Sequence, residues 1–250
     1  MTDHELAARL ATDAGRLLLR VRDELADATP GERKAAGDKR SHDFLTEALA
    51  AERPDDAVLS EEGVDDPVRL SADRVWIVDP LDGTREFRER GRIDWAVHVA
   101  LSVGGAPAVG AVALPALDMV LSTGAPPDLQ PPTGEPPRLV VSRSRPPEVA
   151  YDVAEALGAV MVPLGSAGAK IAAVILGDAE VYVHAGGQYE WDSCAPAAVA
   201  LASGLHASRL DGSPLRYGDP DAWLPDLVVC RPEYASAVLD VTTRQRRPYW

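Results

Sequence analysis

Apolar residues in the first fifty positions recur every three or four residues, which is the spacing of amphipathic helices. This periodicity predicts a first helix over 3–28 and, after a polar loop over 29–37, a second helix. The second helix is expected to begin at Asp38 and to end near residue 51. An aspartate at that position is an ordinary N-cap, because its carboxylate can accept a backbone N–H of the first turn.

From residue 57 onward, short apolar runs alternate with amphipathic segments, and Gly, Pro and Asp separate them. The apolar runs predict strands at 57–60, 75–78, 93–103, 108–114, 139–142, 160–164, 180–184, 205–210 and 226–230. The amphipathic segments predict helices at 147–157, 169–176 and 195–203, with turns at 104–107 and 185–188. No internal repeat is visible, and the alternation of strands and helices predicts an α/β fold.

Six prolines between residues 123 and 137 interrupt this alternation and predict a loop. The loop divides the chain into a candidate N-terminal lobe, 1–135, and a candidate C-terminal lobe, 136–250. The chain has 250 residues, of which 46% are apolar, and this is enough for a large core. We therefore expect the two lobes to pack into one integrated unit.

The charge balance narrows the classes of partner. A net charge of −14 argues against a nucleic-acid polymer or an anionic membrane. It does not exclude a phosphorylated small molecule, because bound divalent cations can reverse the local field.

The chain shows no targeting or membrane signal of the usual kind. Its N-terminus lacks the basic and then apolar order of a signal peptide, and glycines and prolines interrupt the uncharged stretch 95–117. Cys194 and Cys230 have no C-x-x-C spacing and are expected to be two buried thiols in a reducing compartment. A cytoplasmic protein with no membrane partner is therefore expected.

Two carboxylates follow the apolar run 75–78, in the segment Asp79-Pro80-Leu81-Asp82-Gly83-Thr84. Pro80 is expected to end the strand, because proline cannot donate to a sheet ladder. Gly83 permits a tight turn, and Thr84 can cap the helical turn that follows. Paired carboxylates beside free backbone N–H groups suit a hard cation and the phosphate that it binds. A surface turn built from Asp, Pro and Gly is the alternative.

Two further segments strengthen the hypothesis of a cation site. Leu59-Ser60-Glu61-Glu62-Gly63 places paired carboxylates after another apolar residue. Glu190-Trp191-Asp192-Ser193 precedes the helix expected over 195–203, where Asp192 is either a metal ligand or merely an N-cap.

Other polar residues have less specific interpretations. Three aspartates in a loop over 63–74 are expected on a solvated surface, and His98 is expected in the core. The segment Gly165-Ser166-Ala167-Gly168-Ala169-Lys170 has neither P-loop nor dinucleotide-binding spacing. It is either a tight connection between a strand and a helix, or it brings backbone N–H groups and Lys170 to an anionic group.

The three acidic segments, in this order, resemble the inositol monophosphatase superfamily of lithium-sensitive, magnesium-dependent phosphatases. The segments 59–62, 79–87, 165–170 and 210–217 make the chain similar to the CysQ-type 3′(2′),5′-bisphosphate nucleotidase branch. The resemblance implies an α+β layered fold, an alternating α-β-α-β-α sandwich of two lobes, with most metal ligands in the first. Members of the family are often homodimers.

The resemblance also implies the metal ligands. Glu61, Asp79 and the Leu81 carbonyl would bind one Mg²⁺, while Asp79, Asp82 and Asp192 would bind a second. A third, weaker ion would use Glu61 and water molecules. Two to three Mg²⁺ ions per site are therefore expected.

The catalytic residues implied by the resemblance are Asp38, Glu61 and Thr84. A metal-activated water would attack the phosphate in line, while Thr84, polarised by Asp38, and Glu61 orient the water and accept its proton. Many relatives carry Pro-Val-Thr-x-Ala-Asp where this chain has Lys34-Ala35-Ala36-Gly37-Asp38. The residues expected to contact substrate are Glu61, Leu81, Asp82, Gly83, Thr84, Ser166, Lys170 and Asp192.

The implied reaction is hydrolysis of the 3′-phosphate of 3′-phosphoadenosine 5′-phosphate, which gives AMP and phosphate and serves sulfate assimilation and nucleotide recycling. Residues 205–217 are expected to contact the nucleoside. One alternative is an inositol monophosphatase or fructose-1,6-bisphosphatase of broad specificity. A second alternative is a non-catalytic, metal-dependent protein that binds phosphorylated ligands.

Overall fold

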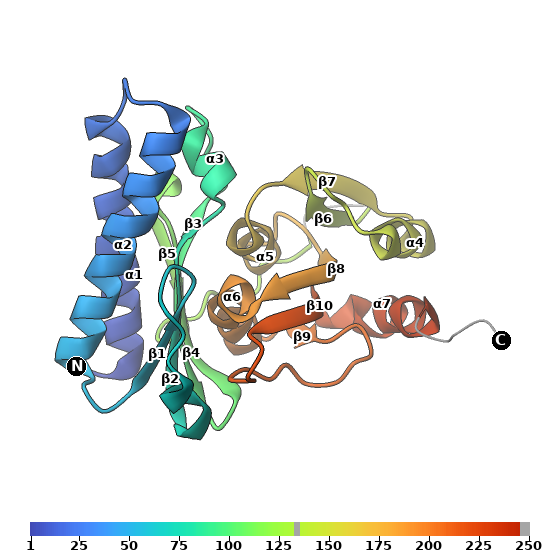
Figure 1. Cartoon of the computed structure of the whole chain (residues 1–250). Helices are drawn as coiled ribbons and strands as arrows, with labels where there is room; N and C mark the ends of the chain where they lie inside the picture. Colours follow the sequence, from blue (N-terminus) through green and yellow to red (C-terminus); the bar gives the residue numbers. More distant parts are fainter. Residues whose placement is uncertain (133–135, 246–250) are drawn as a thin grey trace.

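Two long helices begin the chain and pack against one face of the first sheet (Figure 1). They are α1 (Asp3–Glu24) and α2 (Pro30–Glu52). Thr29 and Glu32 form a capping box at the start of α2, with Pro30 as the first helical residue. The predicted loop over 29–37 is therefore wrong, because these residues already form the first turns of α2. Asp38 consequently lies inside a helix and is not its N-cap.

The first sheet has the strand order β1-β2-β3-β4-β5. Its strands are β1 (Ala57–Ser60), β2 (Arg74–Asp82), β3 (Ala96–Val103), β4 (Ala106–Leu114) and β5 (Met119–Ser122). The pair β1 and β2 is parallel, and the other pairs are antiparallel. Short helices lie between strands: η1 (Pro67–Ser71), α3 (Thr84–Arg88) and η2 (Pro115–Leu117).

Two local predictions at the end of β2 need correction. The strand continues past Pro80 to Asp82, because a register shift between Asp79 and Asp82 places Pro80 and Leu81 outside the regular ladder with β3. Gly83, whose φ is +83°, is the N-cap of α3, and Thr84 is the first helical residue. Only glycine adopts that left-handed conformation without strain.

The loop over 63–74 is more ordered than predicted. Its 3₁₀-helix η1 contains Arg69, a buried arginine whose Nε donates to Asp65 Oδ1 at 2.5 Å. Arg69 Nη1 also donates to the Asp219 carbonyl at 2.8 Å. This segment is therefore tied to the second half of the chain, and Asp65 is not merely solvated.

The second sheet has the strand order β7-β6-β8-β10-β9. Its strands are β6 (Arg138–Ser142), β7 (Val160–Leu164), β8 (Val181–Tyr189), β9 (His206–Ser208) and β10 (Trp223–Cys230). The helices of this half are α4 (Glu148–Leu157), α5 (Ala167–Ile175), α6 (Glu190–Ala202) and α7 (Pro232–Gln245). Strand β6 is parallel to β7 and to β8, whereas β10 is antiparallel to β8 and to β9.

Two predictions for this half are corrected, and one helix was missed. Residues 185–188 continue β8 in place of the predicted turn, with a register irregularity opposite 224–226 of β10. Helix α6 begins at Glu190 and not at residue 195. Helix α7 was not predicted from the sequence pattern.

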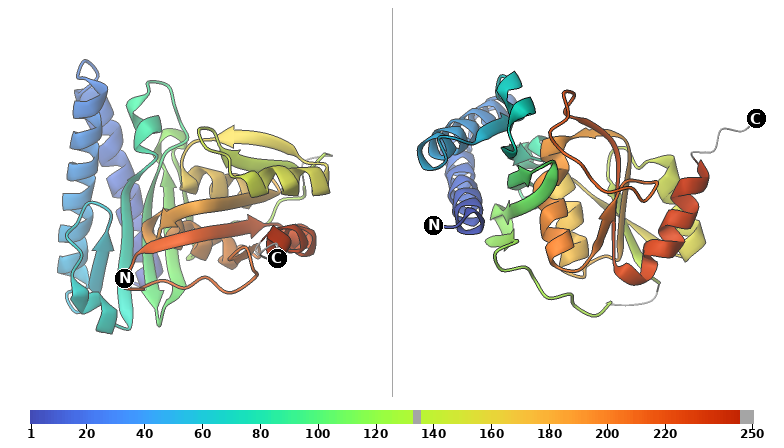
Figure 2. Two further views of the ribbon diagram at one scale, coloured as in Figure 1. Left: turned by 45° about the vertical axis from the view of Figure 1, so that its right-hand side comes forward. Right: turned by 90° about the horizontal axis from the view of Figure 1, so that it is seen from below.

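Five layers follow one another in space: α1 and α2, the first sheet, α5 and α6, the second sheet, and finally α4 and α7 (Figures 1 and 2). One apolar cluster joins both sheets to α5 and α6, and two further clusters lie under the outer helices. The layered α-β-α-β-α prediction is confirmed. The structure, a computed structural model, describes residues 1–132 and 136–245. None of the helices in these ranges combines the length and apolar character needed to cross a membrane.

Candidate active site

Two buried carboxylates lie at the end of β2. Asp79 is 1% exposed and Asp82 is 5% exposed. The Asp79 Oδ1 accepts the Leu81 N–H at 2.9 Å, and Ser41 Oγ donates to the Pro80 carbonyl at 2.7 Å. These bonds hold the irregular end of the strand in one conformation, so that both aspartates lie at the same edge of the sheet.

Asp192 approaches the same point from the other half of the chain. It is the third residue of α6, and its Oδ2 accepts the Tyr189 N–H at 2.6 Å. The prediction that it precedes its helix is therefore wrong. One carboxylate oxygen from each of Asp79, Asp82 and Asp192 lies within 4.8 Å of the others. The first sheet and the central helical layer thus each contribute to one cluster of acids.

Asp82 is also bound by the segment that follows β7. Its two oxygens accept the Gly168 N–H at 2.6 Å and the Ala167 N–H at 3.2 Å. A Cβ on Gly168 would lie 2.1 Å from His98 Nε2 and 2.9 Å from Asp82 Oδ2. Glycine is therefore required here for the close approach of α5 to the first sheet. These two N–H groups are used within the protein.

His98 is buried, as predicted, but it belongs to the site. Its Nε2 lies 3.2 Å from Asp82 Oδ2, and its Nδ1 lies 3.0 Å from the Trp191 carbonyl oxygen. Burial opposes the charged imidazolium, but the Asp82 carboxylate outweighs this and raises the pKa of His98. In turn, burial alone would raise the pKa of Asp82, and the positive charge of His98 lowers it instead.

Lys170 does not reach the acidic cluster. It is 4% exposed, and its Nζ donates to the carbonyl oxygens of Gly165 and of Ser166, the latter at 2.7 Å. Burial lowers its pKa. The prediction that Lys170 contacts substrate is not supported by this position. Ser166 does line the cleft, while its Oγ accepts the Ala169 N–H at 3.0 Å and caps α5.

Glu61 completes the acidic wall at the end of β1. Burial is the main cause that raises its pKa to about 7, and the charges of Asp192, Glu62 and Asp82 add to it. Burial and neighbouring carboxylates also raise the pKa of Asp192 to about 6, and that of Asp79 well above its usual range. The buried Asp79 and Asp82, the half-buried Asp192 and Glu61 at the mouth repel one another, and together they form a set of oxygen donors that fits a hard divalent cation.

The hydrogen bond expected between Asp38 and Thr84 is replaced by one between Asp38 and Lys34. Asp38 is buried in α2, and its Oδ2 accepts Lys34 Nζ at 2.8 Å. Within the described ranges, the Thr84 hydroxyl has no hydrogen-bond partner. Lys34 lines the cleft together with Thr84 and Glu61. The sequence signal for this pair is the i, i+4 spacing of Lys34 and Asp38 on one helical face.

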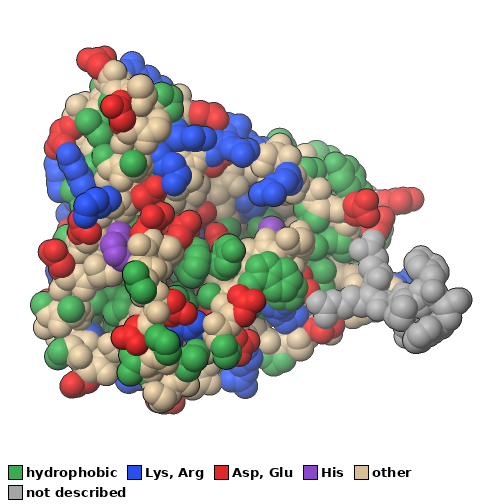
Figure 3. All heavy atoms as spheres, in the orientation of Figure 1, with side chains coloured by type: hydrophobic (Ala, Val, Ile, Leu, Met, Phe, Trp, Pro, Cys, Tyr) green, Lys and Arg blue, Asp and Glu red, His purple; other side chains and the backbone are tan. Residues whose placement is uncertain are grey.

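These residues surround a cleft of about 380 Å³. The residues expected to contact substrate all line it except Lys170, and they are Glu61, Leu81, Asp82, Gly83, Thr84, Ser166 and Asp192. Their contact with substrate stays a prediction. Figure 3 shows the hollow with acidic side chains below it and Lys and Arg side chains gathered along its upper rim. Sequence analysis missed the basic residues that line this cleft, which are Lys34, Arg85, Arg88, Arg143 and Arg145.

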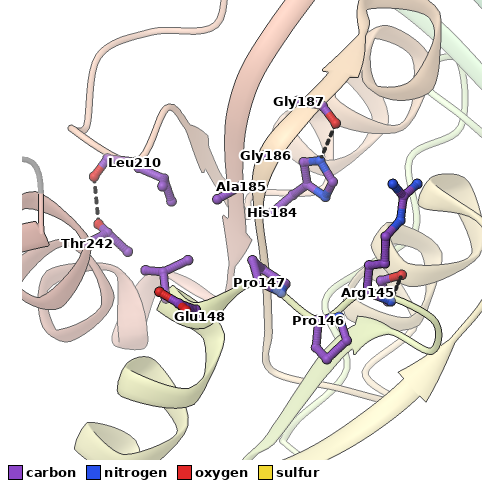
Figure 4. A pocket seen from close by; sticks show the side chains of 12 residues that line it. Arg145, Pro146, Pro147, Glu148, His184, Ala185, Gly186, Gly187, Leu210 and Thr242 are labelled. Atoms are coloured by element: carbon purple, nitrogen blue, oxygen red, sulfur yellow. Dashed lines mark hydrogen bonds between the residues drawn. The ribbon is translucent and has the colours of Figure 1, made fainter.

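A second cavity, of about 650 Å³, adjoins the cleft at Arg145, which lines both (Figure 4). It lies between the start of α4 and the bend of β8 that contains His184, Gly186 and Gly187. His184 Nε2 lies 2.9 Å from the Gly187 carbonyl oxygen. Of the residues 205–217 that were expected to contact a nucleoside, only Leu210 lines this cavity.

Comparison with known proteins confirms the resemblance in the sequence. The sequence pattern of the inositol monophosphatase family matches residues 4–245. A 3′-phosphoadenosine 5′-phosphate phosphatase of Mycobacterium leprae is 50% identical, over 96% of this chain and 93% of its own. A protein of the same name from Mycobacterium tuberculosis is 54% identical, over 91% of this chain and 88% of its own.

A solved structure shows the same fold. The crystal structure of CysQ from Bacteroides thetaiotaomicron matches with a TM-score of 0.75 and 28% identity. The match covers 90% of this chain and 96% of that one. The likeness therefore extends over both sheets.

Proposed function

Because the chain belongs to the inositol monophosphatase family, we propose that it is a Mg²⁺-dependent phosphatase that converts 3′-phosphoadenosine 5′-phosphate to AMP and phosphate. Two mycobacterial relatives that carry the name of this activity are at least 50% identical over most of the chain. This reaction would recycle a nucleotide by-product of sulfate assimilation. The observation that carries the proposal is the convergence of Asp79, Asp82 and Asp192 on one cleft.

The proposed ligands are the ones that the sequence suggested. Asp79, Asp82 and Asp192 would share one Mg²⁺, and Glu61, Asp79 and the Leu81 carbonyl would bind another. A third ion on Glu61 completes the proposal of two to three ions. Bound Mg²⁺ would supply the positive charge that a phosphate dianion requires and would lower the pKa of water.

The residues of the chain have separate tasks in this proposal. Glu61 lines the cleft beside the proposed metal ligands, where its carboxylate can accept a proton from a water molecule. Thr84 lines the cleft with a free hydroxyl that can orient a water molecule or a phosphate oxygen. Asp38 acts through Lys34, because its carboxylate holds the ammonium group at the edge of the cleft. His98 and the backbone N–H groups of α5 hold Asp82 in place.

Phosphate release from three substrates, compared side by side, tests the proposal. These substrates are 3′-phosphoadenosine 5′-phosphate, inositol 1-phosphate and fructose 1,6-bisphosphate, each with Mg²⁺ and then with added Li⁺. We expect the nucleotide to have the highest kcat/KM by at least about tenfold, and Li⁺ to inhibit. A higher kcat/KM for either of the other two would overturn the assignment of substrate. If the protein hydrolyses none of the three, the non-catalytic binding protein becomes the better interpretation.

A further inference from the structure

The connection between β9 and β10 crosses from the second half of the chain to the first sheet (Figure 2). Its residues 217–220, which we call the strap, belong to no helix or strand. The Tyr217 N–H donates at 3.0 Å to the carbonyl of Gly105, in the turn between β3 and β4. The Tyr217 hydroxyl lies 3.2 Å from Ser193 Oγ of α6. The strap thus bridges the sheet and the helix that together supply the acidic cluster.

Two buried side chains of opposite charge hold the backbone of the strap. Glu190, the first residue of α6, is fully buried, and its carboxylate accepts the Gly218 N–H at 2.7 Å and the Asp219 N–H at 3.0 Å. Arg69 of η1 is 1% exposed, and its guanidinium donates to the carbonyl oxygens of Asp219 at 2.8 Å and of Pro220 at 3.3 Å. The donors of the strap therefore bind to α6, and its acceptors bind to the segment that follows β1.

This arrangement costs free energy, because a buried charge loses its hydration. Glu190 recovers part of that loss from the N–H groups of the strap, and Arg69 recovers it from the strap carbonyls and from Asp65. Apolar side chains would fill the same space without this cost, but they would not fix individual backbone atoms. The two charges therefore define the position of the strap relative to both elements.

We propose that Arg69 and Glu190 are positioning residues of the metal site, which act through the strap to hold the start of α6 against the first sheet. The proposal rests on the proposed function, in which the three clustered aspartates bind one Mg²⁺. Asp192 lies two residues beyond Glu190 in the same helical turn, so a movement of that turn moves its carboxylate. In the described part of the chain, neither Arg69 nor Glu190 lines the cleft or the larger cavity. Their effect is therefore expected on metal affinity and not on contact with substrate.

The first test is Arg69→Gln, studied by calorimetric titration of metal-stripped protein with Mg²⁺. We expect the Kd for Mg²⁺ to rise by about tenfold, which is the usual effect of losing a group that orients a metal ligand. The matched control is Arg231→Gln. Arg231 is also a buried arginine, and it donates to the Gln130 carbonyl at 2.6 Å and to Glu233 at 2.7 Å, away from both cavities. The control should keep the wild-type Kd even where its melting temperature falls.

Glu190 provides a graded test, which decides the matter if Arg69→Gln does not fold. A glutamine keeps one side-chain oxygen for the N–H groups of the strap, whereas an alanine keeps none. The Kd for Mg²⁺ should therefore increase from wild type to Glu190→Gln and further to Glu190→Ala. The matched control is Glu180→Gln, because Glu180 is also fully buried and accepts the Arg138 N–H at 2.6 Å outside both cavities. It should bind Mg²⁺ as wild type does.

Steady-state rates separate positioning from a loss of fold. At saturating Mg²⁺, Arg69→Gln and Glu190→Gln should recover most of the wild-type kcat, because added metal compensates for the weaker affinity. A kcat that stays low there, an unchanged Kd for Mg²⁺, or an equal rise of Kd in the controls would each refute the positioning role. If the wild type binds Mg²⁺ but hydrolyses no phosphate ester, and the variants still bind Mg²⁺ more weakly, the positioning role stands and the proposed function fails. If the wild type binds no Mg²⁺, both proposals fail.

Discussion

At the scale of single residues, the account depends on acidic side chains that repel one another until a cation binds. Asp192 offers the cleanest test, because an asparagine can still accept the Tyr189 N–H through its amide oxygen. Asp192→Asn should lower kcat for the nucleotide by at least about 100-fold and raise the Mg²⁺ concentration required for half-maximal rate. Steady-state rates across a Mg²⁺ titration measure both effects.

The same variant should not unfold the protein. Removing one of several crowded like charges relieves repulsion, so the metal-free variant should melt at the wild-type temperature or above it. A wild-type rate in Asp192→Asn would remove this residue from the metal site. A strongly lowered melting temperature would show that its role is structural.

The pKa shifts of these acids predict a pH-dependent effect of metal on stability. Glu61 and Asp192 have folded pKa values of about 7 and about 6, above their ordinary values of 4.5 and 3.8. The metal-free folded state thus binds more protons than the unfolded state, and its stability falls as pH rises between about 4 and about 7. Mg²⁺ should therefore raise Tm more at about pH 8 than at about pH 5. Equal shifts at both pH values would contradict this linkage.

The residues of the site differ in how far sequence could identify them. Glu61, Asp79 and Asp82 could be found because carboxylates at the ends of apolar runs are visible in one dimension. The roles of His98 and Lys34 depend on which side chain lies opposite, Asp82 in one case and Asp38 in the other. Arg85 and Arg88 of α3 and Arg145 of the loop after β6 come from two separate segments, and only the tertiary fold places them on one cleft.

At the scale of elements, the start of α5 is the critical junction. It approaches the first sheet so closely that the Gly168 N–H donates to Asp82 at 2.6 Å. Gly168→Ala would place a methyl group 2.1 Å from His98 Nε2 and force α5 outward. We expect a loss of about 1–3 kcal/mol in the free energy of unfolding, together with a loss of activity. Urea unfolding and steady-state kinetics measure the two effects.

Gly31→Ala is the matched control for that substitution. Gly31 lies in the first turn of α2, where the nearest heavy atom would be 4.0 Å from an added Cβ. Alanine should stabilise the protein here by about 0.4–1 kcal/mol, because it restricts the unfolded chain. If Gly168→Ala is as harmless as this control, α5 does not hold Asp82 through close packing.

Errors in the predicted elements have specific physical causes. The loop predicted over 29–37 is helical because the Thr29–Glu32 capping box and Pro30 start α2 earlier than its apolar stripe does. Pro80 did not end β2, since a register shift between Asp79 and Asp82 accommodates it. The strands of the middle of both sheets were predicted well, because burial on both faces leaves continuous apolar runs.

At the scale of the whole molecule, the central helical layer joins the two halves. A single apolar cluster includes Ile77 of the first sheet, Ile171 and Val199 of α5 and α6, and Leu227 of the second sheet. Because the halves share this core, we expect one unfolding transition. The unfolding curves recorded by far-UV and by near-UV circular dichroism should coincide across a denaturant titration. Two separated transitions would show that the halves fold independently.

The central claim is that this cleft removes the 3′-phosphate of 3′-phosphoadenosine 5′-phosphate only when metal is bound. The most direct measurement follows the nucleotide products by chromatography, with metal-stripped protein to which Mg²⁺ is added in steps. The account predicts no product before Mg²⁺ is added, and then AMP at a rate that rises and saturates. Formation of AMP in the presence of a chelator, or of adenosine 3′-phosphate as the product, would contradict it.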